Sequence, residues 1–347
     1  MKGKCYIQGM AAISPQPTFE ENLFSAQLLY TDNNLLPCKE PDYKPFIPAN
    51  SLRRMSRMLK IGLTTALKAI TDSNLTVQGP IVTGTGKGSL QDTEKFLKEI
   101  VTYQETALNP TPFIQSTYNS VNGLIALQQK CTAYNNTFVH RGFSFENALL
   151  DSMMLLQEGS DHVLTGAFEE ITAEHFYIKS RIGFWKSEQI DSRELLLHNT
   201  PGSVAGEGAA FFMLTQEPTD QSYAAINGLK LLYKPSAEKV LSTLQAFAPE
   251  VDAVITGRNG DCRFNHFYNI VEQHFDNIPH IPFKHLCGEY DTASAFGMWL
   301  GANLLKHQEL PEAWFAKDQH PSKPINKILL YNHFYGEQHA FILLERV

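Results

Sequence analysis

Clustered positive charge and closely spaced cysteines are both missing from this 347-residue sequence. Its lysines and arginines are scattered and its net charge is −7, which argues against a nucleic-acid or anionic-membrane surface, because both need clustered cations. The 5 cysteines form no C-x-x-C pair, and the 12 histidines lack metal-binding spacing. We therefore expect no disulfide framework, no metal and no cofactor.

Long apolar runs are missing too. No segment approaches the roughly 20 apolar residues that a membrane span needs, so no span is expected. The segment Met1–Ile13 has two lysines before a short apolar stretch, and it fits either a signal peptide or a first β-strand. Gln8 and Gly9 interrupt that stretch and favour the strand. Without an export signal, we expect a cytoplasmic protein.

The patterning that is present alternates between strands and helices. Strands are predicted at 79–85, 137–140, 162–167, 224–232, 251–256, 328–331 and 340–344. Helices are predicted at 50–70, 116–128, 145–158 and 236–247. Asn50 or Ser51 can cap the first helix and Ser144 the third, whereas prolines make 109–115 a stiff loop. The alternation indicates an α/β fold with helix-covered sheets.

Two segments share a pattern in which a glycine-containing turn leads into a strand. G-E-G-A-A-F-F-M-L spans 206–214, and G-E-Q-H-A-F-I-L-L spans 336–344. Each follows a series of strand–helix units, so we predict a duplication. The N-terminal half would be 1–215 and the C-terminal half 224–347, packed as one compact unit.

The segment N-N-T-F-V-H-R-G-F-S-F-E-N-A-L-L-D-S, Asn135–Ser152, has the pattern of a strand, a sharp corner and a helix. In α/β enzymes a nucleophile often lies at such a corner, where the helix N-terminus favours negative charge. Here the tip of the corner is Gly142, which carries no nucleophile.

Several segments, in this order, resemble the β-ketoacyl synthase (condensing enzyme) branch of the thiolase fold. R-R-M-S-R-M at 53–58 is similar to the start of an early synthase helix, and 119–170 is similar to the central block without a gap. G-E-G-A at 206–209, K-H-L-C-G-E-Y at 284–290 and N-H-F-Y-G-E-Q-H-A at 332–340 resemble later family segments. The resemblance implies a thiolase-like α/β fold, layered α-β-α-β-α, built from two duplicated halves.

The catalytic positions of that family are replaced in this chain. The resemblance places the nucleophilic cysteine at Gly142, the first histidine at Gly257 and the second at Glu289, and only the supporting lysine is kept, as Lys284. Glycine offers neither a thiol nor a proton, and a carboxylate opposes the charge of an enolate or oxyanion. No catalytic residue is therefore expected, and the chain is not expected to condense acyl groups alone.

Three other side chains offer alternatives. Cys287 lies two residues before the second histidine position and Cys131 precedes the elbow strand, but neither sits at a strand-to-helix corner. A displaced active thiol is therefore the less favoured interpretation, because a nucleophile and its base must be within hydrogen-bond reach. His140 is either a base or an ordinary residue of the elbow strand near an interface, and we prefer the latter.

Synthases of this family are typically two-fold dimers, and polyketide and aryl-polyene systems pair an active ketosynthase with an inactive chain-length factor that shapes the acyl tunnel. The sequence resembles such factors, in particular those of aryl-polyene and flexirubin-type pigment pathways. The resemblance implies a heterodimer with a ketosynthase, contact with an acyl carrier protein through that partner, or a homodimer in isolation. Two alternatives stay open: an active synthase or acyltransferase with a displaced nucleophile, and a stand-alone acyl-binding scaffold.

Two segments are expected to meet the partner. The strand Asn135–His140 would cross the dimer, with Asn135, Thr137 and His140 at the interface. The segment Pro112–Gly123 would lie near the interface and the tunnel end. Three of its side chains are either limits on acyl length or ordinary core or surface residues: Phe113, Thr117 and Tyr118.

Overall fold

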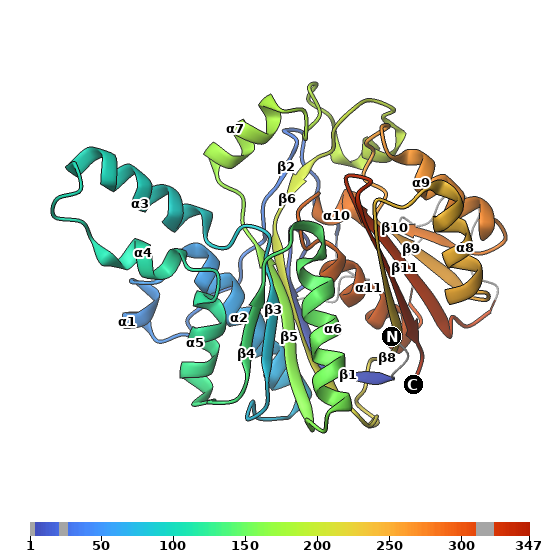
Figure 1. Cartoon of the computed structure of the whole chain (residues 1–347), viewed down its shortest axis with the longest axis horizontal. Coiled ribbons are helices and arrows are strands. Elements are labelled where there is room, and N and C mark those ends of the chain that lie inside the picture. Colours follow the sequence, from blue (N-terminus) through green and yellow to red (C-terminus); the bar gives the residue numbers. More distant parts are fainter. Residues whose placement is uncertain (1–3, 21–26, 310–322) are drawn as a thin grey trace.

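Ten strands of the computed structural model, which describes residues 4–20, 27–309 and 323–347, form one mixed sheet (Figure 1). Its N-terminal strands are β1 (Cys5–Ile13), β3 (Ile81–Gly84), β4 (Asn135–Phe138), β5 (His162–Glu169) and β7 (Gly208–Thr215). Its C-terminal strands are β8 (Ala224–Tyr233), β9 (Ala253–Thr256), β10 (His280–Pro282), β11 (Lys327–Phe334) and β12 (Gln338–Glu345). A separate short pair joins β2 (Leu35–Leu36) to β6 (Ala205–Gly206).

The two sets of strands have the same topology. One set runs β4-β3-β5-β7-β1 and the other β10-β9-β11-β12-β8, so equivalent strands occupy equivalent places. In each set the first two pairings are parallel and the last two antiparallel. β1 and β8 join the sets through a short antiparallel pairing. The predicted duplication of the fold is confirmed, because the strands after the two glycine turns, β7 and β12, correspond.

Helices cover and separate the two sets of strands. α2 (Arg57–Ser73) and α5 (Ser120–Gln129) pack on the outer face of the N-terminal strands, and α8 (Ala237–Phe247) and α9 (Asn265–His274) cover that of the C-terminal strands (Figure 1). α6 (Ser144–Gln157) and α11 (Ser294–His307) lie between them. This is the predicted α-β-α-β-α layering.

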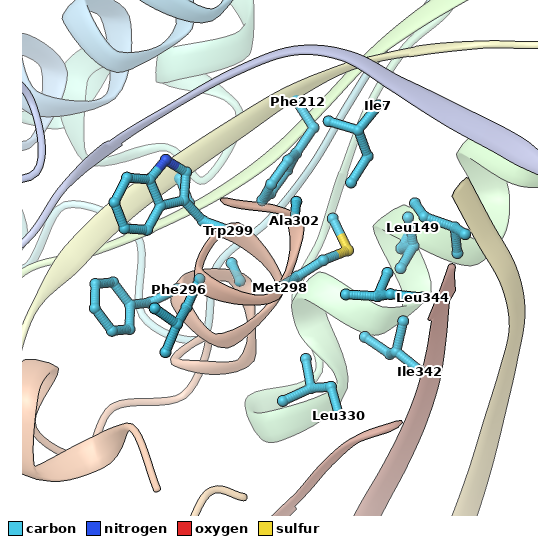
Figure 2. Packing of buried hydrophobic residues seen from close by; sticks show 14 of the residues in the cluster. Ile7, Leu149, Phe212, Phe296, Met298, Trp299, Ala302, Leu330, Ile342 and Leu344 are labelled. Carbon is cyan, nitrogen blue, oxygen red and sulfur yellow. The ribbon is translucent and has the colours of Figure 1, made fainter. Parts of the chain in front are cut away.

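The central layer is built around α11, whose residues 294–305 are all buried. Figure 2 shows this helix between strands of both halves. The helix contributes Phe296, Met298, Trp299 and Ala302 to the cluster, and the strands contribute Ile7, Phe212, Leu330, Ile342 and Leu344. Sequence periodicity did not predict α11, because a helix buried on every side has no polar face to reveal its period.

The remaining described helices are short or peripheral. They are α1 (Ala49–Leu52), α3 (Leu90–Tyr103), α4 (Pro110–Ser116), α7 (Ala173–Arg181) and α10 (Lys284–Cys287), with 3-10 turns at Arg141–Phe143 and Ser192–Leu197. α3 and α4 extend from the body as an arm (Figure 1). None of the helices in the described ranges is long and apolar enough to cross a membrane.

Two predicted segments before β4 differ from the structure. The predicted loop at 109–115 is mostly α4, because Pro110 sits at the first helical position, where no amide donor is needed, and Asn109 caps the helix by accepting from Thr111 N at 3.0 Å. The helix predicted from Asn50 is two helices, since α1 ends at Leu52 and α2 starts only after Ser56.

Candidate functional site: a filled nucleophile elbow

The corner between β4 and α6 keeps the form of a nucleophile elbow. β4 ends at Phe138, two residues earlier than predicted, and the 3-10 turn leads directly into α6. Arg141 has a φ of +52°, a left-handed backbone conformation that residues other than glycine seldom adopt. Gln338 of β12 holds the turn, because its Oε1 accepts from Gly142 N at 2.9 Å and its Nε2 donates to His140 O at 3.1 Å.

Ser144 braces the same corner and does not cap α6 as predicted. Its Oγ accepts from His140 N at 2.8 Å and donates to Arg141 O at 2.7 Å. The hydroxyl is therefore occupied by the turn that precedes the helix, and it is not available to the free amides of the first helical turn.

Gly142 has no space for a side chain. An ideal Cβ at this residue would lie 2.2 Å from Cβ and 2.6 Å from Cγ of Phe334, and 3.2 Å from Oε1 of Gln338. The nearest atom is a Cβ, which moves only with its backbone. The aromatic residue at the end of β11 thus fills the position from which a nucleophilic side chain would start.

The first histidine position is filled in a similar way. Gly257 follows β9, its N–H donates to Tyr331 O at 2.9 Å, and its carbonyl accepts from the hydroxyl of Tyr268 at 2.5 Å. A Cβ added to Gly257 would lie 2.1 Å from Oδ1 of Asn332. An imidazole does not fit here unless the side chain of Asn332 moves away.

The second histidine position holds a buried ion pair. Lys284 Nζ lies 2.9 and 2.7 Å from the two carboxylate oxygens of Glu289, and Asn259 Nδ2 donates to the same carboxylate at 2.6 Å. Both charged side chains are almost fully buried. Burial raises the pKa of Glu289, and Lys284 opposes that rise. Each charge is compensated by the other, so neither is free to stabilise a reacting group.

These three positions meet at the end of β11. Phe334 fills the space at Gly142, Asn332 that at Gly257, and the carbonyl of His333 lies 3.5 Å from Lys284 Nζ. The cavity beside them has a volume of about 20 Å³, which is room for about one water molecule. The structure therefore brings the predicted positions together, and the cavity that the described residues form beside them is too small for an acyl chain.

Buried carboxyl groups line this cavity. Burial, and then the nearby Asp291, raise the pKa of Glu169 to about 8, although Gly86 N and Thr85 Oγ1 donate to it. Asp291 is paired with Lys87 at 2.9 Å. Among the described residues, no three His, Cys, Asp or Glu side chains are placed to hold a metal ion.

The three alternative side chains differ in their burial and their contacts. Cys287 is fully buried, and burial raises its pKa far above the usual range, so its thiolate is disfavoured. Cys131 is half-buried and its Sγ lies 3.3 Å from Gly79 O. His140 is exposed, with Nδ1 3.0 Å from Asn147 Nδ2.

His333 is a buried imidazole that sequence reasoning did not single out. Its ring stacks on Tyr268 with centroids 4.3 Å apart and lies in the aromatic cluster under α9. Burial, and then His339, lower its pKa well below the usual range. It is a neutral packing residue, and its signal in the sequence, one of twelve histidines, was not distinctive.

The G-E-G-A segment supports the loop of the second histidine position. Glu207 accepts hydrogen bonds from Cys38 N at 2.8 Å and Ile171 N at 3.0 Å, and its carboxylate is paired with Arg57. A Cβ at Gly206 would lie 1.9 Å from the Cys287 carbonyl oxygen. The glycine is needed for this close approach of two backbones.

The predicted interface residues lie on an open side of the molecule. β4 is the outermost strand of its sheet. On its inner side, the carbonyls of Tyr134 and Phe138 accept hydrogen bonds from the amides of Ile81 and Thr85. Strand alternation therefore directs the backbone groups of Asn135 and Thr137 toward the open edge. Exposed apolar side chains flank β4 at Tyr134 and Val139, and others lie on or after α3 and α4: Leu97, Val101, Phe113, Ile114 and Tyr118.

Comparisons with known proteins agree with this fold. Residues 31–181, less than half of the chain, match the family model described as beta-ketoacyl synthase, N-terminal domain. A search among curated proteins finds no match.

Three solved structures resemble the chain over its whole length. A beta-ketoacyl synthase from Burkholderia phymatum has a TM-score of 0.81 at 14% identity, with 100% of both chains covered. The ishigamide ketosynthase/chain length factor has a TM-score of 0.76 at 14% identity, with 100% of both covered. A ketosynthase in complex with its chain length factor from Xenorhabdus doucetiae has a TM-score of 0.76 at 14% identity, covering 100% of this chain and 98% of that one. The chain has the fold of these ketosynthase structures, and its residues 31–181 are similar to the N-terminal domain of beta-ketoacyl synthases.

Proposed function

We propose that the chain is a non-catalytic, chain-length-factor-like subunit, which pairs with an active β-ketoacyl synthase and shapes its acyl tunnel. The filled elbow carries the proposal: Phe334 takes the space of any side chain at Gly142, and the Lys284–Glu289 pair takes the second histidine position. A subunit with neither a thiol nor an acyl cavity at this centre contributes through its surface.

The open edge of β4 is the proposed pairing surface. An unpaired strand edge attracts a second strand, and the exposed apolar side chains beside it are suited to burial against a partner. Asn135, Thr137 and His140 would meet the ketosynthase there. Two of the similar solved structures are ketosynthase and chain-length-factor pairs, which supports this choice of partner.

Three exposed residues are the proposed limits on acyl length. Phe113, Thr117 and Tyr118 lie on or just after α4, and none of them is buried within this chain. Their side chains are therefore free to project across the interface toward the end of the partner's tunnel. The acyl carrier protein would be engaged through the ketosynthase.

The pathway and organisation of the chain are proposed on the sequence resemblance. It favours a cytoplasmic role in the synthesis of aryl-polyene or flexirubin-type pigments, with the chain divided into halves at 1–215 and 224–347 that form one unit. The repeated strand order supports that division.

Co-expression with the ketosynthase encoded beside this chain tests the proposal. We expect a 1:1 complex that makes polyketide only when both subunits are present, and Phe113→Ala or Thr117→Trp to change product length. A homodimer that ignores the ketosynthase would favour a stand-alone acyl-binding scaffold. Acylation of the isolated chain, lost in Cys287→Ser or Cys131→Ser, would favour a displaced nucleophile, an outcome that the burial of Cys287 does not support.

A further inference from the structure

A groove of about 540 Å³ lies between α3 and the segment that leads into α7. It shares Glu170 and Ile171 with the small cavity at the elbow, but most of its lining comes from α3, which no position of the condensing reaction uses. Its volume is within the range of small-molecule sites, roughly 300 to 1,000 Å³. Its charged lining residues on α3 are Glu94, Lys95, Lys98 and Glu99.

The groove has more carboxylates than available cations. Of its basic residues, Lys98 is paired with Glu174, and Arg57 is committed to Glu207 and Glu40. Lys95 is then the remaining cation of the described lining, whereas Glu94, Glu99 and Glu170 supply three carboxyl groups. The lining is therefore suited to a positively charged ligand and disfavours an anion.

Two carboxylate oxygens in the groove lack a donor. Glu170 is only 4% exposed, and the hydrogen bonds to it, from Gln91 N at 3.0 Å and Ser89 Oγ at 3.4 Å, both reach Oε1. Within the described part of the chain no donor reaches its Oε2. The buried Oε2 of Glu99 also has none. Buried carboxylate oxygens are normally satisfied, so Oε2 of Glu99 indicates a missing donor, and Oε2 of Glu170 is left free to accept a further hydrogen bond.

We propose that this groove binds a small molecule with ammonium groups, which donate to Oε2 of Glu170 and Oε2 of Glu99. An ammonium group carries three donors and the compensating positive charge, whereas a hydroxyl carries no charge. Tyr103 and Ile171 line the same groove and can contact the carbon chain of the ligand. None of the residues that line this groove is among those proposed to meet the ketosynthase.

The ionisation of Glu170 gives the site a pH signature. Burial raises its pKa to about 7, the Gln91 amide and Arg57 oppose this rise, and Glu207 and Asp92 add to it. A cation binds the ionised carboxylate, so its affinity is expected to be higher at pH 8 than at pH 6.

Calorimetric titration of the whole protein with 1,4-diaminobutane tests the proposal, with 1,4-butanediol as the uncharged probe of similar length. We expect the diamine to bind and the diol not to bind. Glu170→Gln and Glu99→Gln should each weaken binding about tenfold, because each loses a charge-assisted hydrogen bond. Glu217→Gln makes the same change of charge on the connector after β7, outside the groove, and should bind the diamine like the wild type.

Two outcomes would overturn the proposal. One is a diamine that binds no better than the diol at pH 8. Another is a wild-type affinity in both Glu170→Gln and Glu99→Gln. Thermal unfolding of each variant identifies loss of the fold, and Glu99, which is less buried than Glu170, keeps the test decisive if Glu170→Gln does not fold.

Discussion

Restoring the cysteine at the elbow tip should fail to restore the chemistry. In Gly142→Cys the new Cβ would start 2.2 Å from Cβ of Phe334, well inside van der Waals contact. Overpacking of this kind typically costs about 1 to 3 kcal/mol, and a clash with a Cβ that moves only with its strand belongs at the upper end. We expect a loss of about 3 kcal/mol in the free energy of unfolding.

The corresponding fall in melting temperature follows from the size of the chain. An unfolding entropy of roughly 2 cal/mol/K per residue gives about 0.7 kcal/mol/K for the whole chain, so 3 kcal/mol lowers Tm by about 4 °C. Differential scanning calorimetry measures this shift. Mass spectrometry after incubation with an acyl thioester measures acylation of the new thiol, and none is expected because the adjoining cavity holds only about one water.

A matched control is available at Gly123 in α5. A Cβ there would meet nothing within 4 Å, so Gly123→Cys makes the same chemical change without a clash and should not lower Tm. Adding Phe334→Gly to Gly142→Cys removes the obstructing Cβ, and the two changes should be less destabilising together than the sum of each alone. A Gly142→Cys protein that melts like the Gly123→Cys control and forms an acyl thioester would refute the reasoning.

Three further predictions concern the ion pair, the strand edge and a buried histidine. Lys284→Met should lower the free energy of unfolding in urea by about 3 to 5 kcal/mol, because Glu289 is left buried and uncompensated. The double variant Lys284→Met with Glu289→Met should lose less stability. Equal losses in the two variants would contradict this prediction. Thr137→Pro should abolish co-purification with the ketosynthase, because it removes a backbone amide from the open edge of β4. Thr137→Val keeps that amide and should still co-purify. Pairing that survives the proline would argue against the β4 edge as the pairing surface. Burial lowers the pKa of His285 to about 4, below its unfolded value of about 6.5, so between pH 6.5 and 4 the unfolded chain binds a proton that the folded chain does not. Stability should fall on acidification, and His285→Gln should reduce that slope by about 1.4 kcal/mol per pH unit; a slope equal to that of the wild type would exclude His285 as a source.

Local sequence patterns predicted those elements whose signals are carried by neighbouring residues. The alternation of strands and helices gave the α/β class, and the shared glycine turns before β7 and β12 predicted the duplication. Errors occurred where local rules compete. Prolines that suggested a loop at 109–115 begin α4, and the serine that looked like a cap for α6 serves the preceding turn.

The candidate site was predictable as a set of positions and not as an arrangement. The resemblance to synthases predicted that Gly142, Gly257 and Glu289 take the reactive positions, and with them the absence of the thiol and the imidazoles. It carried no sign that Glu289 neutralises Lys284, since their pairing depends on the path of the loop between α10 and α11.

The sequence alone determined that the corner after β4 lacks a nucleophile, because the absence of a side chain is a property of one residue. Only the tertiary structure decided that the corner is filled, because Phe334 reaches Gly142 from a strand that pairs in the other half of the sheet. Which atoms share a volume depends on how the two halves pack. No spacing along the chain records that packing, so the closed elbow, the buried ion pair and the groove beside α3 emerged only with the fold.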